Sequence, residues 1–80
     1  MSKADNFLKL VDILKKLRSP GGCEWDRDQT HSSLIPYLTE ETYEVIEAIE
    51  NNDSSALKEE LGALLLHVLF QAELSSEKEE

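Results

Sequence analysis

Two stretches with helical spacing of apolar residues, joined by a short polar turn, constrain the fold of this chain more than any other feature. The turn spans residues 51–55, and its Asn, Asp and Ser side chains can cap the helix that follows. Helices linked so closely are expected to pack antiparallel. The predicted core stripes are Leu38, Thr42, Val45 and Ile49, flanked by Ile46 and Ala48, in the first helix, and Leu57, Leu61, Leu64, Val68 and Ala72 in the second.

A third apolar pattern predicts another helix near the N-terminus, over residues 4–17 with Ser2 as its cap. It should end before the Pro-Gly-Gly sequence at residues 20–22, because proline disfavours a continuing helix and glycine permits positive φ. The apolar positions that recur every three or four residues are Phe7, Leu10, Leu14 and Leu17.

The remaining boundaries follow from capping and breaker residues. Residues 20–30 are expected to form a loop, and the middle helix should start from a cap at Thr30 or Ser32 and end near Glu50. The last helix should span residues 56–74, with the Ser and Glu residues beyond it frayed. No stretch alternates with period two, so we predict an all-α fold of a helical hairpin plus an N-terminal helix.

The size of the chain favours an oligomer. A chain of 80 residues buries only about 60% of the surface that its unfolded form exposes, so its own core is marginal. The last helix is also apolar nearly all round, which indicates that it is covered on more than one side. The residues that widen its apolar face are Leu65, Leu66, Leu69 and Phe70.

The charge distribution argues against nucleic acid and membrane partners. Residues 1–39 carry six Lys or Arg and five Asp or Glu, whereas residues 40–80 carry two Lys and twelve Asp or Glu. Such an acidic half repels phosphates, so nucleotides could approach only with a metal ion. No apolar run reaches the roughly 18 residues needed to span a bilayer. With Cys23 as the single cysteine, an intrachain disulfide and CxxC motifs are excluded, and we expect a cytoplasmic protein.

Three glutamates lie at the border of the two predicted stripes. At 100° per residue, Glu41 falls between Leu38 and Val45, Glu44 lies slightly further out, and Glu60 takes the same offset beside the second stripe. In an antiparallel hairpin these borders could face one another and bring the three carboxylates together. Glu40, Glu47 and Glu50 fall on the opposite, solvated side.

Carboxylates forced together at the edge of a core either take up protons or bind a cation. Ligands made only of charged oxygens suit Mg²⁺, with Mn²⁺ as the alternative ion. The other interpretation is that the glutamates are ordinary surface residues paired with lysines, as most glutamates at i, i+3 are, and helical spacing alone favours this second interpretation. His67 and Gln71 continue the Glu60 stripe, so they could orient ligands or water, or could simply be core or interface residues.

The loop at residues 20–30 contains Trp25, which has two equally acceptable roles. It could plug the end of a small core or stack on a ligand, and the two roles are compatible. Neighbouring charged residues are Glu24, Asp26, Arg27 and Asp28.

From about residue 8 to residue 74 the sequence resembles the MazG-type nucleoside triphosphate pyrophosphohydrolases. The resemblance combines a Trp-containing loop, an EExxE motif at residues 40–44 and an ExxD-like motif, with fifteen residues between Glu44 and Glu60. The matching positions are Gly22, Cys23, Glu24, Trp25 and Asp26; Gln29, Thr30, His31, Ser33 and Leu34; Tyr37, Leu38, Glu40, Glu41, Tyr43, Glu44 and Val45; and Glu59, Glu60, Leu61 and Gly62, before a Leu-rich stretch.

The resemblance implies helices that pair across a dimer, or a further tetramer, into four-helix bundles. It also implies Mg²⁺-dependent cleavage of a nucleoside triphosphate between the α and β phosphates, giving the monophosphate and pyrophosphate. By position, Glu41, Glu44 and Glu60 would be catalytic metal ligands, and Glu40 would assist them. In such a mechanism the metal neutralises phosphate charge and lowers the pKa of a bound water that a nearby glutamate deprotonates.

The resemblance also implies where the nucleotide lies. Trp25, Asp26 and Arg27 would be near it, with the indole stacking on the base. Positive charge for the triphosphate would come from the metal, from Arg27, from Lys58 or from a partner subunit.

Two departures from the family pattern affect the predicted activity. The family carries an aspartate three residues after Glu60, where this chain has Ala63, so turnover should be impaired. The family also carries a further helix and a basic segment after the third helix, so we expect residues 1–80 to be a single MazG-like domain, truncated after that helix. The alternative function is an inactive module that binds nucleotide or metal, or that dimerises.

Overall fold

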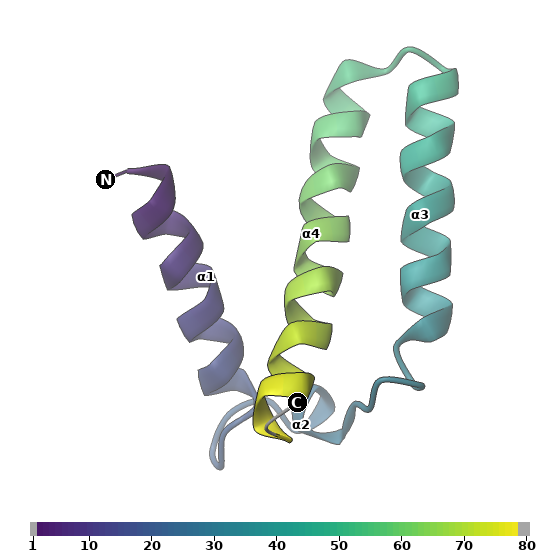
Figure 1. Cartoon of the computed structure of the whole chain (residues 1–80). Coiled ribbons are helices and arrows are strands. Elements are labelled where there is room, and N and C mark those ends of the chain that lie inside the picture. Colours follow the sequence, from purple (N-terminus) through teal and green to yellow (C-terminus); the bar gives the residue numbers. More distant parts are fainter. Residues whose placement is uncertain (1, 79–80) are drawn as a thin grey trace.

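A computed structural model describes residues 2–78, which contain four helices and no strand. Figure 1 shows α3 and α4 as an antiparallel hairpin. The α1 helix diverges from α4 toward the N-terminus of the chain, and α2 lies close to the C-terminal end of α4. The predicted all-α fold and hairpin are therefore confirmed. None of the helices within residues 2–78 combines the length and the hydropathy that a membrane-spanning segment requires. The helices are α1 (Lys3–Leu17), α2 (Glu24–Asp28), α3 (Ile35–Glu50) and α4 (Ser54–Glu77).

The turn between α3 and α4 is set by three consecutive polar residues. Asn52 adopts the left-handed conformation with φ 54°, which asparagine tolerates better than most residues. Its N–H donates to Ile49 O at 3.1 Å, and the N–H of Asp53 donates to Ala48 O at 3.0 Å, which together form a Schellman motif. The Asp53 carboxylate then caps α4 by accepting from Ala56 N at 3.0 Å. This compact link fixes the antiparallel pairing of the two long helices.

The ends of α1 agree with the sequence patterns. Ser2 Oγ accepts from Asp5 N at 3.1 Å, as predicted for the cap. After α1 the chain folds back so closely that a Cβ on Gly22 would lie only 2.3 Å from Lys16 O. A side chain at that position is therefore excluded, and the reversal directs the following segment back along the end of α1.

Three predicted boundaries were wrong. Residues 20–30 are not all loop, because Glu24–Asp28 form α2. Thr30 and Ser32 do not cap α3, which begins at Ile35. Instead, Thr30 N donates to Ser33 Oγ at 2.8 Å and Ser33 N donates to Thr30 Oγ1 at 3.0 Å, so these residues form a separate turn. The last helix continues past residue 74 to Glu77, because Glu77 is held by an ion pair with Arg18.

The main core lies where α1, α4 and the segment before α3 meet. Its four buried side chains are those of Leu14, Leu34, Phe70 and Leu74, with Leu69 partly buried against them. Leu34 is the most deeply buried, with 1% of its surface exposed. Trp25 does not plug this core, since it is 51% exposed.

The interface between α3 and α4 is narrower than predicted and is rotated toward the glutamates. Val45 and Ala48 are buried there, but Ile49 is 55% exposed and Thr42 is also exposed. On α4, Leu61 and Val68 of the predicted core stripe are 48% and 53% exposed. Among the described helices, only α4 packs along α3, so one narrow strip of α3 is covered and its other apolar positions stay open.

Candidate metal centre

Three glutamates from two helices converge beside the α3–α4 interface. Glu41 and Glu44 lie one turn apart on α3, and Glu60 faces them from α4. One carboxylate oxygen from each residue lies within 4.8 Å of the other two. Glu41 and Glu60 are partly buried and Glu44 is exposed, so the cluster lies at the edge of the interface and is open to solvent. The structure thus brings together the three residues that the sequence analysis placed at facing borders.

The electrostatics of the cluster are unfavourable in the absence of a cation. The neighbouring carboxyl of Glu60, through hydrogen bonding and then charge repulsion, raises the pKa of Glu44. The pKa of Glu60 is likewise raised, first by its hydrogen bond with Glu41. Glu41 Oε1 is buried and has no hydrogen-bond partner among the described residues. A buried acceptor without a donor is costly, so the cluster favours a proton or a cation.

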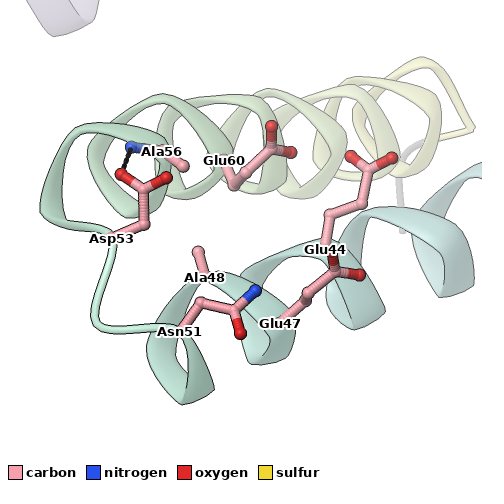
Figure 2. A pocket seen from close by; sticks show the side chains of 7 residues that line it. All are labelled: Glu44, Glu47, Ala48, Asn51, Asp53, Ala56 and Glu60. Atoms are coloured by element: carbon pink, nitrogen blue, oxygen red, sulfur yellow. Dashed lines mark hydrogen bonds between the residues drawn. The ribbon is translucent and has the colours of Figure 1, made fainter.

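Two of the three glutamates, Glu44 and Glu60, line a polar cavity of about 310 Å³ between α3 and α4. Figure 2 shows Glu44 and Glu60 reaching in from the two helices, while Asn51 and Asp53 lie toward the connecting turn. The cavity is lined by Glu44, Glu47, Ala48, Asn51, Asp53, Ala56 and Glu60. Small side chains on both helices leave this space open beside the carboxylates.

The donor set fits a hard divalent cation. All three candidate ligands are carboxylates, and hard cations such as Mg²⁺ or Mn²⁺ prefer oxygen ligands. A set of three protein ligands would leave coordination positions for water or phosphate oxygens. Ala63 lies one turn beyond Glu60 on α4 and is half-buried, so it adds a methyl group and no ligand on that side.

The other predicted site residues lie outside this cavity. Trp25 and Asp26 line a separate apolar cavity of about 390 Å³ between α1 and α4, which His67 also borders. Arg27 is exposed on α2, and Lys58 is exposed on α4. Glu40 is exposed on α3, and its charge contributes to raising the pKa of Glu44. The structure therefore separates the predicted metal ligands from the predicted base-stacking residues.

Gln71 and His31 pair with each other. Gln71 Nε2 donates to His31 O at 3.2 Å, and His31 Nδ1 bonds Gln71 Oε1. Gln71 thus joins α4 to the turn before α3, which accounts for its partial burial without a role at the carboxylates.

Sequence reasoning missed several residues around these cavities. Glu47 was assigned to the solvated side, and Asn51 was assigned only to the turn, yet both line the carboxylate cavity. Their spacing from Glu44, three and seven residues, is the signal that could have placed them on its face. The pairing of Arg18 with Glu77 left no comparable local signal.

Comparison with known proteins supports the family resemblance. Residues 29–80 match the family model described as MazG nucleotide pyrophosphohydrolase domain. The nucleoside triphosphate pyrophosphohydrolase/pyrophosphatase MazG of Thermotoga maritima is 58% identical over 72 residues, which are 90% of this chain and 28% of the relative.

Two other similar proteins carry the name nucleoside triphosphate pyrophosphohydrolase. The Escherichia coli (strain K12) protein is 45% identical over 71 residues, covering 88% of this chain and 27% of the relative. The Mycobacterium tuberculosis protein is 41% identical over 75 residues, covering 94% of this chain and 22% of the relative. The chain thus spans less than a third of the length of these curated relatives.

Proposed function

Because the chain belongs to the MazG nucleotide pyrophosphohydrolase domain family, we propose that it hydrolyses nucleoside triphosphates to the monophosphate and pyrophosphate at Glu41, Glu44 and Glu60. The observation that carries this proposal is the convergence of the three carboxylates within 4.8 Å, with one buried oxygen that has no hydrogen-bond partner in residues 2–78. The names of the similar proteins support the reaction class.

The cluster would hold Mg²⁺, or alternatively Mn²⁺, which when bound supplies Lewis-acid stabilisation of phosphate charge and a water of lowered pKa. Glu41, from inside the interface, would fix the position of the ligand set. Glu44 and Glu60, at the open edge, would face the substrate. Glu40 would add negative charge beside Glu44 and favour cation binding.

The cavity next to the cluster gives the phosphates a direction of approach. It is open and polar, and only carboxylates, amides and small side chains line it, so a bare triphosphate would be repelled there. Binding should therefore depend on the metal, with Arg27, Lys58 or a partner subunit supplying further positive charge. Trp25 and Asp26 would contact the base.

The decisive experiment measures monophosphate and pyrophosphate release from nucleoside triphosphates with Mg²⁺ and with a chelator. Glu41→Gln keeps the size of the side chain but removes its charge, and it should abolish metal-dependent release. Glu50→Gln makes the same charge change on the exposed side of α3 and should leave release unchanged. Equal release by both variants would rule out the carboxylate site.

A second function is supported by Ala63, which places a methyl group where the family pattern has an aspartate. In that case the domain binds metal and nucleotide, or dimerises, without turnover. Calorimetry with Mg²⁺ and a non-hydrolysable nucleotide separates the two binding cases from a pure assembly module, which should show no metal-linked heat. Binding without product release would identify a nucleotide-binding module.

The exposed apolar residues support association with a second copy. Ile46 and Ile49 on α3 and Leu61, Leu65 and Val68 on α4 are all more than two-fifths exposed. Such a surface is typical of an interface, and it would complete the small core as a dimer or tetramer. Light scattering of the full chain measures its mass directly, and Ile49→Lys should lower that mass if α3 is buried between copies. The cytoplasmic location and the lack of a nucleic-acid partner stay predictions.

A further inference from the structure

Arg18 is the most heavily bonded side chain described outside the carboxylate cluster. It is the C-cap residue of α1, and only 10% of its side chain is exposed. Its Nε and one terminal nitrogen donate to the two carboxylate oxygens of Glu77 at 2.6 and 2.8 Å. Bidentate pairs of this kind are geometrically specific. One face of the guanidinium also lies 5.7 Å from the centre of the Phe70 ring.

The other terminal nitrogen of Arg18 reaches a different part of the chain. It donates to Asp26 O, in the last turn of α2, and more weakly to Gln29 O at 3.4 Å. These carbonyls lie at the end of a helix of only five residues, which has no side-chain cap. A helix this short has little stability of its own, so its position depends on contacts of this kind.

Trp25 depends on the same segment. It projects from α2 and meets Tyr37 edge to face, with the ring centres 5.9 Å apart and the planes at 79°. Tyr37 lies in the first turn of α3, one turn before Glu41. Arg18 thus connects the ends of α1 and α4 to α2, and α2 contacts the beginning of the helix that carries two of the three clustered glutamates.

We propose that Arg18 is a positioning residue that holds α2, and with it Trp25, in the place required for nucleotide binding. The proposal rests on the proposed function, since it assigns Trp25 to the nucleotide. Arg18 itself does not touch the carboxylate cavity, so its effect on the nucleotide would pass through α2. Lysine cannot replace it, because a single ammonium cannot hold both Glu77 oxygens and the Asp26 carbonyl in one plane.

The test uses the full chain and its only tryptophan as a probe. In Arg18→Lys, acrylamide should quench Trp25 fluorescence more strongly than in the wild type, because α2 is released. Affinity for a non-hydrolysable nucleoside triphosphate with Mg²⁺ should fall by about tenfold through lost preorganisation. Affinity for Mn²⁺ alone, measured by calorimetry, should stay unchanged. Lys16→Gln removes a cation from the exposed side of α1 and is the control. It should change neither the Trp25 quenching nor the affinities for nucleotide and Mn²⁺.

A charge-reversed pair separates positioning from stability. Arg18→Glu combined with Glu77→Arg restores the ion pair between α1 and α4 but provides no donor for Asp26 O from position 18. It should therefore recover much of the melting temperature while the fluorescence and affinity changes persist. If the reversed pair recovered the melting temperature, the Trp25 quenching and the nucleotide affinity together, the proposal would be overturned. Wild-type quenching in Arg18→Lys would also overturn it.

The outcomes also distinguish this proposal from the proposed function. A wild-type chain that binds neither Mn²⁺ nor nucleotide would contradict the metal centre, and the quenching results would still decide whether Arg18 holds α2. A chain that binds nucleotide normally after α2 has been released would contradict the positioning role alone.

Discussion

Two glutamates on α4 have opposite surroundings. Glu60, near the beginning of the helix, meets two more carboxylates, and its pKa is raised. Glu77, in the last turn, meets the guanidinium of Arg18, whose hydrogen bonds lower the pKa of that carboxyl. The same residue type on the same helix is therefore unfavourably placed at one end and stabilised at the other.

The difference suggests that the two ends of α4 have different roles, one in folding and one in binding. At the C-terminal end, the apolar side chains are buried against one another and the charge of Glu77 is paired with Arg18. This end of the helix therefore needs no ligand. At the N-terminal end, like charges surround a buried oxygen that has no hydrogen-bond partner in the described part of the chain, which costs stability until a cation or proton binds. Such local conflict is expected where a chain is shaped for binding rather than for folding alone.

The largest effect on stability is expected at the C-terminal end of α4, in the buried apolar cluster. Phe70→Ala removes a buried aromatic ring from the small core and should lower the free energy of unfolding by roughly 3–5 kcal/mol. Urea denaturation measures the loss, and Phe7→Ala, the same change at a position 46% exposed on α1, is the matched control with a much smaller effect. Equal losses in the two variants would show that the core is not centred on Phe70.

The next effect is at the carboxylates. Glu60→Gln should weaken Mg²⁺-dependent pyrophosphate release by at least about 100-fold, because under the proposed function it removes a charged metal ligand and not merely a supporting residue. Without metal the same variant should melt at a higher temperature than the wild type, since one repelling charge is gone. Glu50→Gln, on the exposed side of α3, is the control. A lower metal-free melting temperature in Glu60→Gln would contradict the idea of a strained cluster.

A smaller change should follow from filling the fourth position. Ala63→Asp adds a carboxylate one turn from Glu60 and should raise Mg²⁺ affinity and pyrophosphate release by about tenfold. The added like charge should also lower the metal-free melting temperature, which sharpens the contrast between the two ends of α4. Ala63→Asn has nearly the same volume without the charge. If the aspartate and asparagine variants behave alike, the missing charge at this position does not limit the site.

Local patterns predicted the elements and the three glutamates because those features depend on spacing within one helix. The Asn51–Asp53 turn carries its own signal, and Glu41, Glu44 and Glu60 were placed by rotation about two helix axes. The apolar stripes were less well predicted: Ile49 and Val68 look like core positions by hydrophobicity, yet each is more than half exposed. Hydrophobicity does not say which apolar face the chain itself covers and which is left for a partner.

Long-range pairs were beyond the reach of spacing arguments. Nothing near Glu77 in the sequence predicts that it meets Arg18, so the last turn of α4 was expected to fray. The contact between the Arg18 side chain and Asp26 O is equally hidden, because it depends on how the chain reverses at Gly22. Tertiary contacts of this kind stabilise short or terminal helices that propensity alone would not predict.

The smallest effect concerns pH and has opposite signs at the two ends of α4. The folded pKa of Glu77 is below its ordinary value of 4.5, so the stability from the Arg18 pair is present above 4.5 and is lost as pH falls through that lowered pKa. The folded pKa values of Glu44 and Glu60 are above 4.5, so the metal-free chain should gain stability as pH falls from neutral through them.

Metal-free melting temperatures measured from neutral pH downward should therefore rise slightly before they fall. Glu60→Gln should remove most of the rise, because the remaining carboxylates repel less, and Glu77→Gln should weaken the fall at the acidic end. With saturating Mg²⁺, the melting temperature should fall, not rise, as pH is lowered from neutral, since protons and metal then compete for the same oxygens. A metal-free wild type whose stability declines steadily from neutral pH would mean that the three carboxylates do not repel one another in solution, and the contrast between the two ends of α4 would fail.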